Sequence, residues 1–165
     1  MPAWYDIIRV GKVPYGKGVF AIREIAQGEM IGRVTGKVIT DPEYTSSYCI
    51  DLGDEVSSLE PRGPFRYLNH CCQPNAKLYL QETVYDDGTP GPTEVSVEAL
   101  TTIAAGEEVR IDYAWDIAGA IPCLCGAMEC RGWIVDPAQL PTLLKKQKKA
   151  AAASGASKAG SNRMK

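Results

Sequence analysis

A cluster of three cysteines within eight residues constrains this chain more than any other feature. The cluster has the spacing C-x-C-x-x-x-x-C, contains Gly126, and consists of Cys123, Cys125 and Cys130. Three thiolates at this spacing come close to a tetrahedral zinc site and need one further ligand. Cys72 is the favoured fourth ligand, with Cys71 and Cys49 as alternatives. A metal held by four cysteines has no open position, so the predicted zinc is structural.

Length and composition predict one folded domain in an intracellular protein. The chain has 165 residues, 45% of them hydrophobic and 23% charged, which excludes wholesale disorder. No apolar run approaches the ~20 residues that span a bilayer, and the segment MPAWYDIIRVGK lacks the features of a secretory signal. Six cysteines in such a chain are not expected to form a disulfide framework. We expect a cytoplasmic protein if the source is prokaryotic, and a nuclear or chromatin-associated one if it is eukaryotic.

Charge divides the chain into an acidic body and a basic tail. Seven basic residues and no acidic residue follow Pro137, which leaves 11 basic against 20 acidic residues in positions 1–136, a net charge of −9. An acidic body attracts cationic partners and repels phosphate backbones. This balance favours a basic polypeptide as the partner and no membrane. Nucleic acid is expected to bind only weakly, through the tail.

Short strand signals separated by Gly, Pro and Asp predict a β-rich body with several small antiparallel sheets. The candidate strands are 4–10, 18–22, 30–34, 48–52, 77–84, 94–100 and 108–113. The turn-rich run 86–92 predicts a long hairpin loop between two of them. After Pro137 the composition predicts a short helix from Leu140 into the lysine and alanine run, followed by a flexible end over the last dozen residues.

Four sequence patterns occur together in one order. They are G-K-G at 16–18, N-H-C-C-Q-P-N at 69–75, G-E-E-V-R-I-D-Y at 106–113 and C-L-C-G-A-M-E-C-R-G at 123–132. Each pattern alone is weak, because a Gly-rich turn or a polar run is common in proteins of every class. In this order they resemble the SET domain of protein-lysine methyltransferases, with its short cysteine-rich post-SET segment. The four patterns that carry the resemblance span residues 16–132, about 70% of the chain.

The resemblance implies a β-rich SET fold with a knot-like C-terminal threading, in which the chain after Glu108 passes beneath the segment of Asn69 and His70. It implies a SET domain over 1–116, a post-SET zinc-binding segment over 117–136 with the ligands Cys72, Cys123, Cys125 and Cys130, and a partly disordered basic tail over 137–165. It further implies an S-adenosyl-L-methionine-dependent protein-lysine N-methyltransferase that acts on a histone or another basic protein tail.

The resemblance also assigns roles to individual residues. The residues expected to contact S-adenosyl-L-methionine are Gly16, Lys17, Gly18, Asn69 and His70. For His70, a role in holding the fold has equal weight. Tyr113 is the expected catalytic tyrosine, with Tyr48 as a second catalytic residue. Tyr48 and Ile111 are expected to line the channel for the target lysine.

Three positions depart from the family pattern. Cys71 stands where relatives usually have Ser, which replaces a hydroxyl with a weakly hydrogen-bonding thiol. Ile111 stands where relatives often have Phe or Tyr, so a second or third methylation is not expected to be blocked. The segment 59–64 is short, which leaves one side of the peptide groove undefined.

Two alternatives stay open at the level of sequence. One is a catalytically silent SET-like module that binds peptides without turnover, although silent relatives often lose one of the residues kept here. The other is a zinc-stabilised interaction domain that binds nucleic acid through its tail, which the charge of the body disfavours. Lysines of the tail, Lys145–Lys149 or Lys158, are also possible targets of self-methylation.

Overall fold

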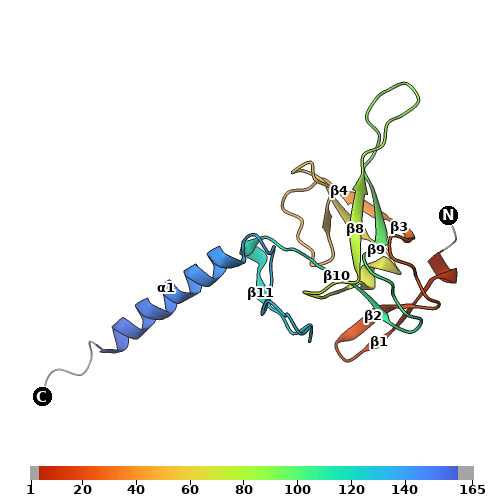
Figure 1. The fold of residues 1–165 in the computed structure, drawn as a ribbon. Coiled ribbons are helices and arrows are strands. Elements are labelled where there is room, and N and C mark those ends of the chain that lie inside the picture. The colour runs from red at the N-terminus through yellow and green to blue at the C-terminus, as the bar shows by residue number, and fades with distance from the viewer. Residues whose placement is uncertain (1–3, 160–165) are drawn as a thin grey trace, which may run out of the picture. The chain divides into compact units, whose positions relative to one another are not determined.

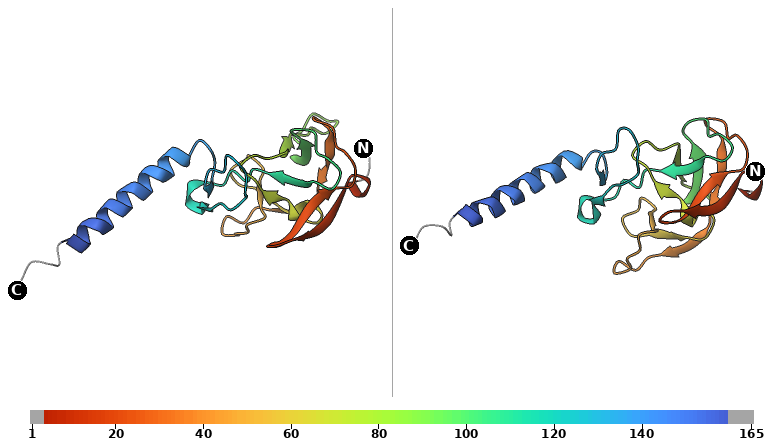
Figure 2. Two further views of the ribbon diagram at one scale, coloured as in Figure 1. Left: turned by 60° about the horizontal axis from the view of Figure 1, so that its bottom comes forward. Right: turned by 90° about the horizontal axis from the view of Figure 1, so that it is seen from below.

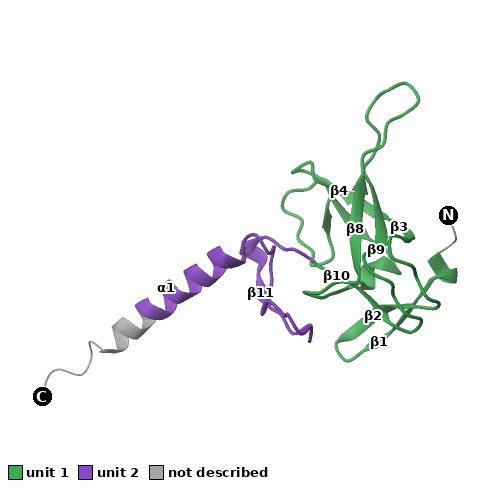
Figure 3. Ribbon diagram, in the orientation of Figure 1, with its two compact units in different colours: residues 1–112 green, residues 113–165 purple. Residues whose placement is uncertain are grey.

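A computed structural model describes the backbone of residues 4–159 and the side chains of residues 4–153 (Figure 1). The chain divides into two compact units, residues 1–112 and 113–165 (Figure 3). Within the described part of the chain, no helix is long and apolar enough to cross a membrane. The predicted division between positions 116 and 117 stays a prediction. The flexible end was expected over residues 154–165, but residues 154–159 are helical. Residues 160–165 lie outside the described part.

Unit 1 consists of short strands arranged in three small sheets, as the sequence predicted. Its elements are η1 (Trp4–Asp6), β1 (Ile8–Val13), β2 (Gly16–Ala21), β3 (Met30–Val34), β4 (Gly36–Ile39), β5 (Ile50–Asp51), β6 (Ser58–Pro61), η2 (Phe65–Tyr67), β7 (Asn69–His70), β8 (Ala76–Gln81), β9 (Glu94–Ala99) and β10 (Glu108–Ile111). The strand orders are β1-β2-β10-β7, β3-β9-β8 and β4-β6-β5.

The sheet β1-β2-β10-β7 joins segments that are far apart in the sequence (Figure 2). β10 pairs with β2 antiparallel, through Glu108 opposite Phe20. On its other side β10 pairs with β7 in parallel, with Arg110 opposite Asn69. A parallel pair needs a long crossover connection, here the whole β8–β9 hairpin and the turn after it. The expected passage of the chain after Glu108 alongside Asn69 and His70 corresponds to this pairing.

The β8–β9 hairpin confirms the predicted long loop. The two strands pair from Ala76 opposite Ala99 to Gln81 opposite Glu94, and residues 82–93 connect them. Along β9, Val95, Val97 and Ala99 are buried while the residues between them are half-buried, because successive side chains of a strand point to opposite faces. These side chains belong to the apolar core of unit 1, whose largest fully buried members are Ile7, Ile8, Ile25, Ile31, Ile103, Val19, Val95, Val97 and Val109.

Several predicted boundaries were wrong. The strand expected over 4–10 begins only at Ile8 and continues to Val13, because Trp4–Asp6 form a 3-10 turn. The strand expected over 48–52 is reduced to Ile50–Asp51. β4 and β6 were not predicted, since each is only four residues long. They obtain their regularity from pairing with each other.

Unit 2 contains the cysteine cluster and the helix. Its elements are η3 (Ile117–Gly119), β11 (Ile121–Pro122), β12 (Trp133–Ile134) and α1 (Leu140–Ala159). β11 and β12 pair antiparallel and flank the cysteine loop. α1 is longer than the short helix that was predicted, with 20 residues. Pro141 is compatible with it because it lies in the first turn, where backbone N–H groups have no partner within the helix.

Candidate functional site

The start of β2 requires glycine at two positions. Gly16 has φ +138, a backbone conformation that other residues rarely adopt. Gly18 is buried, and a Cβ atom there would lie 2.5 Å from Glu108 Oε1 and 3.2 Å from Asn69 Nδ2. The absence of a side chain at Gly18 therefore lets β10 and β7 approach the turn closely.

Asn69 joins this turn to β10. Its Nδ2 donates to the carbonyl oxygen of Lys17, at 3.0 Å, and to Glu108 Oε1, at 2.8 Å. The Lys17 ammonium lies 4.8 Å from the centre of the Tyr67 ring, a cation–π distance. Three of the residues expected to contact the cofactor, Lys17, Gly18 and Asn69, are thus brought together. Glu108 completes the group, although sequence reasoning assigned it no role in cofactor binding.

His70 lies next to Asn69 and is 8% exposed. Its Nδ1 lies 3.5 Å from Asp112 Oδ1, and its Nε2 lies 3.4 Å from Cys72 Sγ. Both ring nitrogens therefore have polar protein neighbours within unit 1. The imidazole thus lies between Asp112, the residue after β10, and the predicted zinc ligand Cys72. Sequence reasoning did not predict this arrangement.

Tyr48 packs against a charged pair just before β5. The Arg66 guanidinium lies 3.8 Å from the centre of the Tyr48 ring. Arg66 donates to Glu60 Oε1 and, at 3.2 Å, to the carbonyl oxygen of Pro61. Hydrogen bonding with Glu60 is the main reason why the pKa of Arg66 is raised and that of Glu60 lowered. Tyr48 is 45% exposed, so the charged pair holds one face of a ring that is otherwise accessible to solvent.

Cys49 lies beside the same carboxylate. Its Sγ is 3.2 Å from Glu60 Oε2. Burial, and then the hydrogen bond and negative charge of Glu60, raise the pKa of the Cys49 thiol to about 11. Metal binding must displace the thiol proton, and the raised pKa makes this more costly for Cys49 than for an ordinary cysteine. This chemistry disfavours Cys49 as a source of the fourth zinc ligand.

The strand β10 ends in a buried residue. Ile111 is 6% exposed, and its carbonyl oxygen accepts a hydrogen bond from the Cys71 N–H at 2.8 Å. Cys71 is 1% exposed, so the thiol that replaces the usual serine is sequestered in the interior. Tyr113 begins unit 2, where its ring stacks on Trp115 with 5.3 Å between ring centroids.

The cysteine loop of unit 2 is folded around its thiols. The Sγ atoms of Cys123 and Cys125 lie within 4.8 Å of each other. Cys130 Sγ accepts from the Gly132 N–H at 3.4 Å, and the Cys123 N–H donates to the Gly132 carbonyl at 2.9 Å. Gly126 and Gly132 take positive φ angles, of 73° and 76°, which let the loop reverse direction. All six cysteines are among the described residues, and none of them forms a disulfide.

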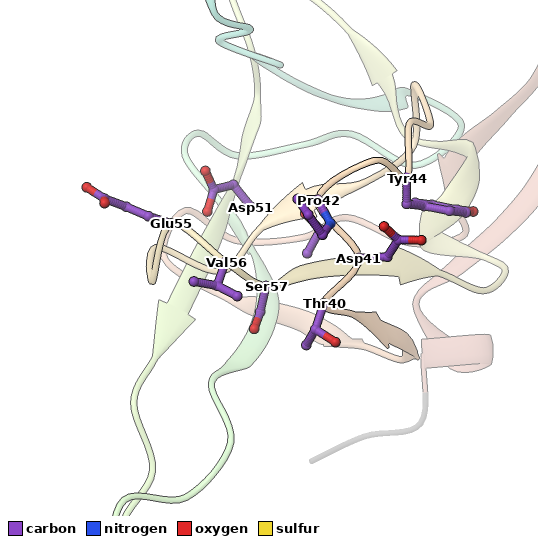
Figure 4. Close-up of a pocket in the computed structure, with 9 residues that line it drawn as sticks. Thr40, Asp41, Pro42, Tyr44, Asp51, Glu55, Val56 and Ser57 are labelled. Carbon is purple, nitrogen blue, oxygen red and sulfur yellow. The ribbon is translucent and has the colours of Figure 1, made fainter.

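An acidic pocket of about 490 Å³ opens at the end of the β4-β6-β5 sheet (Figure 4). Its lining residues come from the segments after β4 and around the β5–β6 turn: Thr40, Asp41, Pro42, Tyr44, Asp51, Glu55, Val56, Ser57 and Ser58. Within the described part of the chain, none of its three carboxylates forms an ion pair. The pocket therefore carries uncompensated negative charge directly after β5.

Comparisons with known proteins identify the family. A profile of the SET domain matches residues 16–114. The chain belongs to the SET domain family, as the four sequence patterns predicted. The cysteine cluster that follows the matched segment fits a post-SET zinc segment.

Curated relatives are histone-lysine N-methyltransferases. An H3 lysine-4 specific enzyme of Saccharomyces cerevisiae is 31% identical over 135 residues, which are 71% of this chain and 12% of that protein. A human H3 lysine-36 specific enzyme is 28% identical over 151 residues, 81% of this chain and 5% of that protein. The chain therefore spans only a small part of the length of the curated relatives it matches.

A solved structure shows the same fold. The crystal structure of KRYPTONITE in complex with mCHH DNA, an H3(1-15) peptide and SAH superposes with a TM-score of 0.61. The match covers 77% of this chain and 29% of that chain, at 20% sequence identity. The β-rich SET architecture predicted from the sequence is thus confirmed.

Proposed function

We propose that this chain is an S-adenosyl-L-methionine-dependent protein-lysine N-methyltransferase acting on a basic protein tail. The observation that carries the proposal is the convergence of Lys17, Gly18 and Asn69 within a SET domain. The naming of the relatives as histone-lysine methyltransferases supports the reaction class. Because these relatives are named for different lysines of histone H3, they leave the target lysine open.

The residues around the β2 turn fit the cofactor. The exposed Gly16 has no side chain and lets a ligand approach the backbone closely. The amide nitrogen of Asn69 is held by Lys17 and Glu108, and its side-chain oxygen is an acceptor for the ligand. The Glu108 carboxylate, already held by Asn69, can take part in binding the cationic end of the ligand. When bound, S-adenosyl-L-methionine supplies the sulfonium methyl group. His70, whose two nitrogens face Asp112 and Cys72, is proposed to support the site mainly by fixing its backbone.

The chain's own residues prepare the target lysine. A free lysine has a pKa of about 10.4, so making it neutral at pH 7 costs about 4–5 kcal/mol. A channel lined by Tyr48, Ile111 and Tyr113 lowers that pKa by desolvation. The remaining acceleration of methyl transfer comes from two effects. The channel aligns the amine with the methyl group, and the phenolic hydroxyl of Tyr113 stabilises the transition state electrostatically. No side chain needs to act as a general base if water carries the proton away.

The buried aliphatic side chain of Ile111 cannot hydrogen-bond a water molecule in the channel. A water held there would occupy the space of an added methyl group. We therefore expect two or three methyl groups on one lysine after exhaustive reaction. A product that stays monomethylated would contradict this role of Ile111.

A structural zinc is proposed on Cys72, Cys123, Cys125 and Cys130. The close thiols of Cys123 and Cys125 support this set. Elemental analysis should give about one zinc per chain, and Cys125→Ser should release it. Cys49→Ser is the matched control and should keep the metal. A metal-free protein with full activity would contradict the proposed structural zinc.

The substrate is proposed to be a basic peptide in extended conformation. β5 is the edge strand of its sheet, so its outer backbone groups can pair with a peptide strand. The acidic pocket that includes Asp51 of β5 favours lysine or arginine beside the target residue. A histone or histone-like tail has this chemistry, and self-methylation of the basic tail is a secondary possibility.

Mass spectrometry of methyl transfer tests the proposal. The protein is incubated with isotopically labelled S-adenosyl-L-methionine and a pool of histones and host lysate, beside Tyr113→Phe. Labelled lysines that disappear in the variant would support the enzyme and name its target. Cofactor binding without transfer of the label would indicate that the pool lacks the substrate or a required partner. Failure both to transfer label and to bind the cofactor would overturn the proposed site and favour the runner-up, a catalytically silent peptide-binding module.

A further inference from the structure

Four lysines lie close together on one side of α1. At about 100° per residue, Lys145, Lys146, Lys148 and Lys149 fall within an arc of about 160°. All four side chains are exposed. The half-buried residues of the same turns, Leu140, Leu143 and Gln147, lie on the opposite side. We call the four lysines the lysine face.

The lysine face has little compensating negative charge. Among the described residues, no carboxylate forms an ion pair with any of the four lysines. Lys146 acts electrostatically on the Asp116 carboxylate, which itself lies in unit 2 and accepts from the Ala118 N–H and Gln139 Nε2. No acidic residue occurs from Pro137 to the end of the chain. Like charges three and four residues apart oppose helix formation, so an external anion would relieve a repulsion built into α1.

The density of charge matches that of a nucleic-acid duplex. The lysine face occupies about 6 Å of helix axis, at 1.5 Å per residue. Double-stranded DNA carries one phosphate charge per about 1.7 Å of its axis, so a similar length of duplex offers between three and four phosphates. We propose that the lysine face of α1 binds the phosphate backbone of double-stranded DNA.

Other polyanions fit the helix less well. A membrane-surface helix needs large apolar side chains opposite its cations. The large apolar side chains opposite the lysine face, Leu140, Leu143 and Leu144, are confined to the start of α1. After Leu144, the side chains described on α1 other than lysine are only Gln147 and Ala150–Ala153. Single-stranded nucleic acid is bound largely by aromatic stacking, and α1 has no aromatic residue. Lysine contacts to phosphate carry no base readout, so the binding should not depend on the DNA sequence.

The proposal is independent of the proposed methyl transfer and is tested on the full chain by binding alone. Fluorescence anisotropy with a labelled mixed-sequence duplex is measured between about 50 and 200 mM KCl. Each lysine that neutralises a phosphate contributes about −0.9 to the slope of log K against log salt. The variant Lys145→Gln/Lys149→Gln keeps the helix propensity. It should make the slope shallower by about 1.8, which reduces the loss of affinity over this salt range by about 10-fold.

A matched variant removes the same charge elsewhere. Lys12→Gln/Lys37→Gln alters two exposed lysines of β1 and β4, in unit 1, and should leave the salt slope unchanged. Equal changes in the two variants would overturn the assignment to α1. So would the absence of binding at the lowest salt concentration. Tighter binding to phosphatidylserine-containing vesicles or to single-stranded DNA than to the duplex would overturn duplex DNA as the partner.

Discussion

Asn75 is the residue whose removal should most clearly weaken unit 1. Its side chain is 8% exposed and makes three hydrogen bonds to the segment that forms β10. Nδ2 donates to Glu107 Oε1 and to the Glu108 carbonyl, both at 2.9 Å, and Oδ1 accepts from the Arg110 N–H at 2.8 Å. The asparagine thus fixes the start of β10 beside the segment that follows β7.

The size of the effect follows from these contacts. Each hydrogen bond contributes about 1 kcal/mol net, and buried groups left without a partner add to the loss. Asn75→Ala should therefore lower the free energy of unfolding by about 3–5 kcal/mol, and the melting temperature by roughly 10 °C. Asn75→Asp should be at least as damaging at neutral pH, because it places a carboxylate against the Glu107 carboxylate and the Glu108 carbonyl oxygen.

Urea unfolding followed by circular dichroism measures this loss. Gln81→Ala, at the exposed end of β8, is the control and should change the free energy of unfolding by less than about 0.5 kcal/mol. If Asn75→Ala costs less than about 1 kcal/mol, the three contacts do not hold β10 and the reasoning is refuted.

Three further predictions concern the site. Arg66→Lys removes the planar group that lies 3.8 Å from the Tyr48 ring. The kcat/KM for a peptide substrate should therefore fall about 10-fold while the cofactor affinity stays unchanged. Equal losses in kcat/KM and in cofactor affinity would indicate general damage to the fold. Burial raises the pKa of Cys49 to about 11. The folded chain then holds this proton more tightly than the unfolded chain, so stability should fall as the pH rises from about 9 to 11, and denaturation curves should show a smaller fall in Cys49→Ala. Gly18→Ala would place a Cβ 2.5 Å from Glu108 Oε1 and should weaken cofactor binding about 10-fold by calorimetry, since the carboxylate must leave Asn69; unchanged binding would remove the β2 turn from the site.

The sequence predicted the class of fold because its informative parts are local. The hairpin of β8 and β9 follows from two alternating segments and a loop rich in turn residues. The cysteine spacing predicts a metal loop without knowledge of any partner. The four patterns in one order predict the family, which the profile match confirms.

The parts that sequence reasoning missed depend on long-range contacts. Glu108 was part of a recognised pattern, but its bond to Asn69 joins positions 39 residues apart. Arg66 was not among the predicted site residues, since nothing local in the sequence reveals that it packs on Tyr48. The short strands β4 and β6 likewise lack an intrinsic signal and form because they pair with each other. In a chain of this class, the motifs can therefore be predicted from the sequence, whereas the contacts that support them are seen only in the structure.

The position of β10 between β2 and β7 has a consequence for how the protein is made. The β2 turn and Asn69 belong to the first half of the chain, yet the strand that lies between them ends only at Ile111. A ribosome must therefore have released nearly all of unit 1 before these groups can meet, and contacts of such sequence separation form slowly. During synthesis the nascent chain exposes the edges of β2 and β7, which places a demand on chaperones. Fragments that stop before β10 should bind no cofactor, whereas the exposed loop of residues 82–93 offers a site where the chain can be interrupted or extended.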